Sequence, residues 1–224
     1  MEDTAYDQLA EIIRRRQTMK VIGNPFKPLE LTEAELSVGD ALVEQAIGNA
    51  GWAPFHYDRQ VDGIAEPWRA TILPQAMCRE IGSRLAEWCP DLKPGNKMPA
   101  MLSVCGCVVL VTWLPQTSAD ISDSAKLSDV NFEHVAAAAA FVQNLLLLLE
   151  AKGLGTYWGS GGMFGDRSIM SRLGISDIEK LLAAVYIEYP ASKGMPLERI
   201  PGGNRARRQP SSQWTRIVRQ ITCG

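Results

Sequence analysis

The run from Val135 to Leu149 constrains the fold of this chain more than any other feature. It contains no charged residue and is made mostly of alanine and leucine. A helix over residues 131–152, ended by Gly153, would be apolar nearly all round, so we expect it to be the buried central helix of the fold. The run is shorter than the roughly 20 apolar residues that cross a bilayer, which favours a core helix over a membrane span.

The remaining patterns predict helices and strands in a mixed order. Helices are expected over 4–16, from the capping box Thr32–Glu35 to Ala50, over 75–89 and over 166–172. Strands are expected over 68–73, 103–113 and 182–189, with a short segment at 156–159, while 90–100 should be a loop and 115–128 a mobile polar segment. We therefore predict an α+β fold, a mostly antiparallel sheet flanked by helices, as one domain over 1–224 with a C-terminal extension from about 190.

Charge and composition exclude some classes of function. The net charge is −2 and the isoelectric point about 5.8, whereas a general nucleic-acid binder needs a cationic surface. The N-terminal residues Met1–Thr4 lack the features of a signal peptide. We expect a cytoplasmic protein that binds neither nucleic acid nor membrane.

The five cysteines form no zinc-binding pattern. They are Cys78, Cys89, Cys105, Cys107 and Cys223. Cys105 and Cys107 alternate within the strand predicted over 103–113, so we expect both side chains on one face, as reduced core thiols.

The chain lacks the familiar motifs of side-chain catalysis. It has no G-x-G-x-x-G, Walker A, G-x-S-x-G or H-E-x-x-H motif, and its only histidines are His56 and His134. No metal site is expected. Chemistry without a side-chain nucleophile indicates a cofactor.

Five segments stand out in chain order. They are the basic run Arg16–Lys20, the run Trp52–His56 followed by Pro67-Trp68, the stretch Phe141–Leu147 ending in Gly153-Leu154-Gly155, the loop 156–162, and Arg205–Pro210. Each has an ordinary interpretation. The basic runs could be solvated, the first at a helix end and the second in a disordered tail, Trp68 could be a core residue, and the loop could simply be flexible.

Taken together and in this order, the segments resemble the nitroreductase family, over about residues 8–215. Arg16–Lys20 is similar to that family's Arg-Arg-Ser-x-Arg/Lys motif, with Gln17 and Thr18 as departures and with the register open because Arg14 and Arg15 precede it. Trp52–His56 is similar to the branch with Ala-Pro-x-His. Phe141–Leu147 is similar to the family's central helix.

The resemblance implies FMN as cofactor, NAD(P)H as co-substrate and a small-molecule electron acceptor, with the chemistry on the flavin and no catalytic side chain. The basic residues would hold the FMN phosphate, and the 156–162 loop would lie against the ring with a backbone N–H at N5. Arg208 has the best-matching spacing near the C-terminus, with Arg205 or Arg207 as its partner. The residues implied to bind the cofactor are Arg15, Arg16, Gln17, Thr18, Lys20, Trp52, Pro54, Phe55, His56, Tyr157, Trp158, Gly159, Ser160, Gly161, Gly162, Arg205 and Arg208.

The resemblance also implies an intertwined homodimer with the flavin in the interface and a ping-pong reduction of nitroaromatic, quinone or similar acceptors. Flavin-fragmenting, dehalogenating or azoline-oxidising activity on the same fold, and flavin binding without turnover, remain alternatives.

This sequence departs from the family pattern by an insertion between His56 and Pro67 and by Glu66 in place of the usual glutamine. Few aliphatic residues lie in Tyr57–Ala65, so we expect a mobile lid that selects the acceptor. A surface excursion without a role is the alternative.

Overall fold

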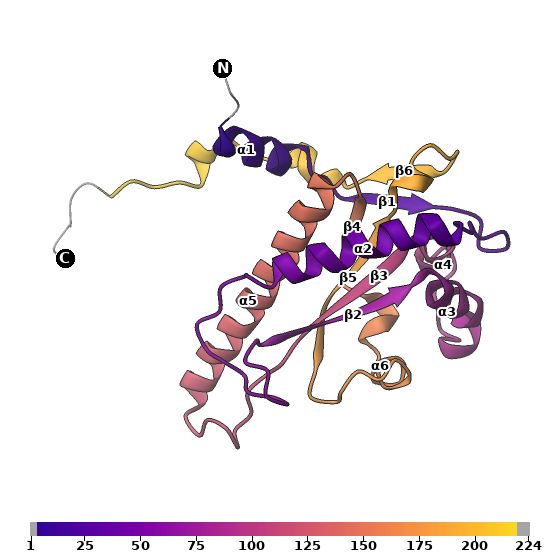
Figure 1. The fold of residues 1–224 in the computed structure, drawn as a ribbon. Coiled ribbons are helices and arrows are strands. Elements are labelled where there is room, and N and C mark those ends of the chain that lie inside the picture. The colour runs from indigo at the N-terminus through magenta and orange to yellow at the C-terminus, as the bar shows by residue number, and fades with distance from the viewer. Residues whose placement is uncertain (1–3, 219–224) are drawn as a thin grey trace.

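A four-stranded antiparallel sheet forms the middle layer of the computed structural model, which describes residues 4–218 (Figure 1). Its strand order is β2-β3-β5-β4, and the strands span Trp68–Pro74, Cys107–Trp113, Lys180–Glu188 and Gly155–Gly159, respectively. A second sheet pairs β1 (Met19–Ile22) with β6 (Glu198–Pro201), also antiparallel. The α+β fold with an antiparallel sheet is confirmed.

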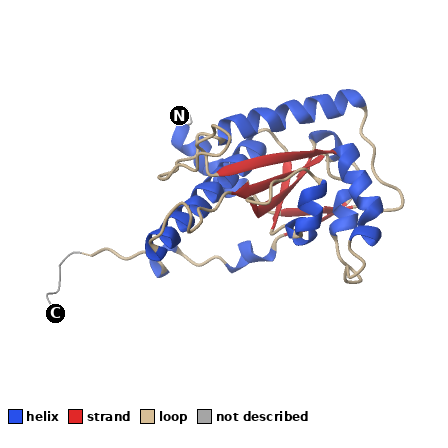
Figure 2. Cartoon of the chain, turned by 90° about the horizontal axis from the view of Figure 1, so that it is seen from below, coloured by secondary structure: helices blue, strands red, loops and turns tan. Residues whose placement is uncertain are grey.

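Helices cover both faces of the four-stranded sheet (Figure 2). One face packs against α2 (Glu33–Ala50) and α5 (Ser124–Ala151), and the other against α3 (Gln75–Trp88), α4 (Met98–Leu102) and α6 (Arg167–Arg172). The amphipathic helix α1 (Ala5–Arg15) lies beside the C-terminal end of α5 and has no buried residue. Short 3₁₀ turns lie at 162–165, 190–192, 203–207 and 211–213.

Strand β3 is buried on both faces, as its continuous apolar run predicts. Cys107, Val109 and Val111 pack in the cluster with α2 and α5, while Val108 and Leu110 pack in the cluster with α3, α4 and α6. Its start differs from the expectation. Residues 98–102 form α4, and the strand begins at Cys107 rather than Ser103.

The cysteine prediction was right on burial and wrong on geometry. Cys78, Cys105 and Cys107 are buried free thiols. Cys105 precedes the strand and packs with Cys78 on the α3 side, whereas Cys107 packs on the α5 side, so the two do not share a face. Cys223 lies outside the described residues.

Helix α5 is longer than expected, because it begins at Ser124 instead of Asn131. The side chain of Asp123 accepts hydrogen bonds from the backbone N–H groups of Ala125 and Lys126 and so caps the first turn. Gly153 follows the helix with a φ of 78°, the left-handed geometry that commonly ends helices. Part of the 115–128 segment is therefore the first turn of the central helix.

The length argument against a membrane span was wrong. At 28 residues, with a mean hydropathy of 1.6 in its most apolar window, α5 is long and apolar enough to cross a membrane by those measures alone. It instead packs on the sheet against β3 and β5, as a core helix does. Only 44% of that window is buried within the single chain, and most of its other residues are partly buried.

A buried ion pair attaches the two-stranded sheet to the main one. The guanidinium of Arg199 on β6 donates to Glu188 Oε1 on β5 from Nη2 at 2.6 Å and from Nε at 3.1 Å, and to the carbonyl oxygen of Ser192 at 2.9 Å. Glu188 is only 6% exposed. β1 and β6 therefore have a fixed position at the β4 edge.

Replacing Glu188 with Gln should lower the free energy of unfolding by about 3 kcal/mol, since it leaves a largely buried guanidinium without its counter-charge. The exposed pair of Arg84 and Glu80 supplies the matched control, and Glu80→Gln should change stability by less than about 0.5 kcal/mol. Urea denaturation measures both. Equal effects of the two substitutions would contradict a structural role for the Glu188–Arg199 pair.

Candidate functional site

The largest hollow among the predicted site residues is a cleft where α1, β1, β4 and the chain after β6 meet. Its volume is about 620 Å³, within the range of small-molecule and cofactor sites. It brings together eight of the predicted residues with four others. The lining residues are Ile13, Arg16, Gln17, Thr18, Lys20, Tyr157, Trp158, Gly202, Gly203, Asn204, Arg205 and Arg208.

Backbone pairing positions the floor of this cleft. Met19 opposes Pro201 in the β1–β6 ladder, and Thr18 bridges to Thr156 just before Tyr157. The N–H of Gly202 donates to the carbonyl oxygen of Thr18 at 2.8 Å. Segments from the start, middle and end of the chain are thus fixed side by side.

The structure distinguishes the arginines at the end of α1. Arg15 turns away from the cleft and pairs with Glu150 of α5, with Nε and Oε1 2.8 Å apart. Arg14 donates to the carbonyl oxygen of Ala10 on its own helix. Arg16, the residue after the helix, lines the cleft. The register that the sequence left open therefore favours Arg16, and the structure does not bring Arg15 to the site.

The cleft is cationic and none of its lining residues is acidic. Burial and the neighbouring Arg205 guanidinium lower the pKa of Arg16 from its ordinary value, while Glu150 partly opposes this. The ammonium of Lys20 lies 5.0 Å from the centre of the Tyr157 ring. A site that disfavours its own positive charges in this way is stabilised by a bound anion.

Arg205 and Arg208 differ in what they contact. Arg205 donates to the carbonyl oxygens of Arg14 and, at 2.6 Å, of Arg16. It thereby holds the C-terminal segment against the end of α1. The side chain of Arg208 makes no hydrogen bond or ion pair with any residue in 4–218. Arg208 is therefore available to an anion, whereas Arg205 chiefly positions the wall of the cleft.

The Trp52–His56 motif lies elsewhere. Pro54, Phe55 and His56 line a second hollow of about 350 Å³ together with Glu133, Ala136, Ala137 and Ala140 of α5. The two hollows share no lining residue. Ala140, which lines the second hollow, and Glu150, which pairs with Arg15 at the end of α1, are ten residues apart and so lie about 15 Å from each other along α5. Trp52 is 88% exposed and lines neither, while Trp68 stacks on Phe141 in the core, as its ordinary interpretation predicted.

The glycine-rich segment Gly159–Gly162 also lines neither hollow. Gly161 has a φ of 96°, and a Cβ there would lie 2.1 Å from Leu181 Cδ2. Packing against the protein's own side chain is thus sufficient reason for glycine at this position. The predicted approach of this loop to a cofactor stays a prediction.

Sequence reasoning missed four lining residues of the cleft. These are Ile13, Gly202, Gly203 and Asn204. The last three lie after β6, a four-residue strand that carries no alternating pattern, so no local signal predicted its pairing with β1.

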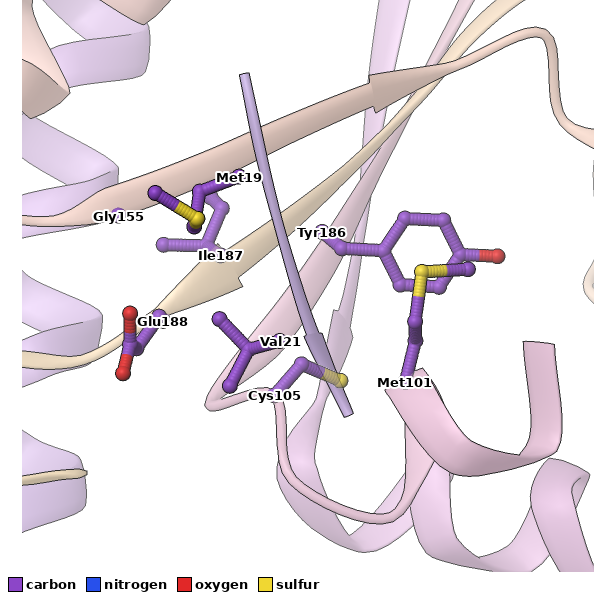
Figure 3. A pocket seen from close by; sticks show the side chains of 8 residues that line it. All are labelled: Met19, Val21, Met101, Cys105, Gly155, Tyr186, Ile187 and Glu188. Carbon is purple, nitrogen blue, oxygen red and sulfur yellow. The ribbon is translucent and has the colours of Figure 1, made fainter. Parts of the chain in front are cut away.

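A small interior gap lies beneath β1 (Figure 3). It is lined by Met19 and Val21 of β1, by Met101 and Cys105, and by Gly155, Tyr186, Ile187 and Glu188. Its volume is about 10 Å³, about enough for one water molecule. Burial raises the pKa of Tyr186 well above its usual range. This gap is a packing feature of the core and not a ligand site.

Comparisons with known proteins identify the family. The sequence model described as "Nitroreductase family" matches residues 33–189. A curated relative, YfhC of Bacillus subtilis (strain 168), which carries the name of an NAD(P)H nitroreductase, is 23% identical over 194 residues, covering 86% of this chain and 90% of YfhC.

Solved structures show the same fold. A nitroreductase-like protein from Bacillus cereus superposes with a TM-score of 0.63 at 18% identity, covering 97% of this chain and 99% of that one. CinD, a nitroreductase from Lactococcus lactis solved with chloramphenicol, gives 0.57 at 11% identity, over 80% and 88%. An FMN complex from Desulfovibrio desulfuricans gives 0.50 at 16% identity, over 90% and 96%. The chain described above belongs to the nitroreductase family of oxidoreductases.

Proposed function

We propose that this protein is an FMN-dependent NAD(P)H oxidoreductase that reduces nitroaromatic, quinone or similar small acceptors. The observation that carries the proposal is the cationic cleft beside Tyr157 and Trp158. FMN is a flat ring joined to one terminal phosphate, and the cleft offers one group of cations next to aromatic side chains. YfhC is named for NAD(P)H, and the Desulfovibrio structure holds FMN.

The residues present fit the phosphate end of FMN. Arg16, Lys20 and Arg208 supply positive charge, and Thr18 supplies a hydroxyl in the same cleft. Charge-assisted hydrogen bonds to a phosphate are stronger than neutral ones. A dianionic phosphate would also relieve the crowding of Arg16 by Arg205. Tyr157 and Trp158 provide aromatic surface toward the ring.

The second hollow supports a site shared between two copies of the chain. Pro54, Phe55 and His56 pack against the middle of α5, in a hollow that shares no lining residue with the cleft of the same chain. In a symmetric dimer each copy presents both surfaces. The hollow of each protomer can then face the cleft of its partner, which gives two equivalent sites. His56 would then donate toward the flavin ring, and Phe55 would pack against it. When bound, FMN would take hydride from NAD(P)H and pass electrons to the acceptor.

Uncovered apolar surface also favours this dimer. Phe132 is 74%, Trp52 88% and Leu9 51% exposed. These residues lie on α5, after α2 and on α1, respectively, and the two helices α1 and α2 both contact α5. Large obligate interfaces between subunits are apolar and resemble a domain core cut in half.

The purified protein should be yellow and release FMN, not FAD, on denaturation. Arg16→Ala should weaken FMN binding about tenfold to a hundredfold, because it removes charge-assisted bonds to the phosphate. Arg14→Ala, two residues earlier and with its side chain bonded to its own helix, is the matched control and should bind normally. Titration of the apoprotein with FMN, followed by flavin fluorescence, measures the affinity of the wild-type protein and of both variants. Full affinity in Arg16→Ala would show that the phosphate lies elsewhere.

Steady-state rates with NAD(P)H and a quinone or nitroaromatic should give parallel double-reciprocal lines. The reason is that both substrates would use the same open face of the flavin in turn. Varying one substrate at several fixed concentrations of the other makes the measurement. Intersecting lines would mean a ternary complex and would count against this mechanism.

The holoprotein should sediment as a dimer at all practical concentrations, and dissociation should release the flavin. Phe132 on α5 and Trp52 after α2 are large exposed apolar side chains that a partner subunit would cover. Sedimentation equilibrium over a dilution series, followed at flavin and protein wavelengths, gives the result. A monomer that keeps its flavin would exclude a shared site.

A further inference from the structure

The insertion after His56 is a folded hairpin. Val61 and Ile64 pair through two backbone hydrogen bonds of 3.2 and 3.0 Å, and the N–H of Arg59 donates to the carbonyl oxygen of Ala65 at 2.8 Å. Asp62 and Gly63 form its turn, with φ values of 56° and 77°. The expectation of a mobile lid rested on the scarcity of aliphatic residues and overlooked these polar contacts.

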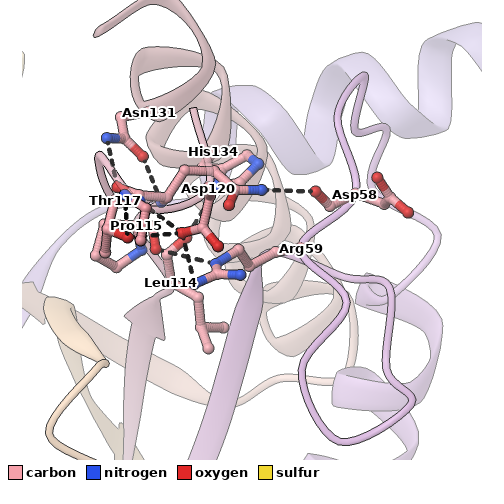
Figure 4. A network of polar contacts seen from close by, with 10 residues as sticks. Asp58, Arg59, Leu114, Pro115, Thr117, Asp120, Asn131 and His134 are labelled. Carbon is pink, nitrogen blue, oxygen red and sulfur yellow. Dashed lines mark hydrogen bonds and ion pairs between the residues drawn. The ribbon is translucent and has the colours of Figure 1, made fainter. Parts of the chain in front are cut away.

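Arg59 joins this hairpin, residues 57–66, to the segment that follows β3. Its side chain is only 14% exposed and lies 3.5 Å from Asp120 Oδ2 by Nη2. Its Nε donates to the carbonyl oxygen of Pro115 at 2.9 Å (Figure 4). Gln116 Nε2 donates back to the carbonyl oxygen of Asp58 at 3.4 Å.

The partner carboxylate is held in place independently of the hairpin. Asp120 Oδ2 accepts from the backbone N–H and the hydroxyl of Thr117 at 2.8 and 2.9 Å. These bonds, and to a lesser degree Arg59, lower the pKa of Asp120. The Arg59 guanidinium therefore meets a pre-positioned anion.

Helix α5 in turn fixes the segment 114–120. Asn131 accepts from the N–H of Gln116 at 2.8 Å and donates to its carbonyl oxygen at 3.1 Å. His134 Nδ1 lies 2.9 Å from the carbonyl oxygen of Leu114 and so carries the proton. Three neighbouring residues of the same helix, Glu133, Ala136 and Ala137, line the hollow beside His56.

Arg69 secures the base of the hairpin. Its guanidinium donates to the carbonyl oxygens of Val61, Glu66 and Trp68 at 3.1, 2.8 and 2.7 Å. Where the hairpin begins, the Tyr57 ring packs edge-on against the ring of His56, with the centroids 4.6 Å apart. The hairpin thus begins directly after His56, which lines the hollow.

We propose that Arg59 is a positioning residue that joins the hairpin 57–66 and the segment 114–120 into one rigid wall beside His56, and that this wall limits the size of the electron acceptor. The inference rests on the proposed function, because it assigns specificity to the same site. A wall held by charged and backbone bonds cannot yield to a larger ring as a flexible loop would. Acceptors with one ring should therefore enter more readily than fused-ring acceptors.

The test compares 1,4-benzoquinone with 1,4-naphthoquinone in the FMN-loaded dimer. Arg59→Met should raise kcat/KM for naphthoquinone relative to benzoquinone about tenfold over wild type, the discrimination typical of a small steric difference in a pocket. The rate of flavin reduction by NAD(P)H should not change. Hydrogen exchange should increase in 57–66 and, to a smaller extent because Asn131 and His134 still bond to it, in 114–120.

Two further variants separate positioning from general destabilisation. Asp120→Asn keeps the Pro115 bond and should give a smaller shift in the same direction. Arg84→Met, which breaks an exposed pair on α3, should leave the acceptor ratio and both exchange patterns unchanged. An acceptor ratio within about twofold of wild type, or increased exchange in the hairpin alone, would overturn the proposal.

The result is distinguishable from failure of the proposed function. A wild-type protein without FMN or without quinone turnover would refute that function, while the exchange experiment would still show whether Arg59 couples the two segments. Normal flavin content and turnover in Arg59→Met, with an unchanged ratio of kcat/KM for the two quinones, would refute the proposed wall and leave the proposed function standing.

Discussion

The structure depends on how the apolar surface of α5 is covered. One side of this 28-residue helix packs on β3 and β5 and against α2, which sets the layers of the fold. The rest is left partly uncovered by its own chain. The same helix bonds Arg15 at its C-terminal end and lines the second hollow near its middle. Under the proposed function, a partner that covers this surface would also complete the site for FMN.

The cleft itself depends on long-range attachments of the C-terminal segment. Arg199 attaches β6 to Glu188, Gly202 bonds to Thr18, and Arg205 bonds to the end of α1. Arg205, which we predicted as a phosphate ligand, lines the cleft and also bonds to the end of α1. Arginines with the same side chain thus differ in their contacts, since Arg205 bonds to the backbone and Arg16 lines the cleft.

The sequence predicted most elements that have strong periodicity or caps, and missed those that depend on distant partners. The capping box at Thr32 and the apolar run of β3 are local signals. The four-residue strands β1 and β6 exist because they pair with each other across the whole chain. In the same way, Glu150 decides that Arg15 turns away from the cleft, and Arg59 orders an insertion whose composition indicates mobility. Family resemblance located the motifs but could not place them in two separate hollows.

The central claim is that one flavin site is built from two copies of the chain, and mixed dimers test it most directly. Arg16→Ala disables the cleft, and His56→Asp places a carboxylate where a hydrogen-bond donor is required. Each variant alone should bind little FMN. If the site is shared, a hybrid of the two variants contains one intact site, so co-expression should restore FMN and activity to about a quarter of the sites after random pairing. No recovery in purified hybrids would mean that each site lies within a single chain and would contradict the account.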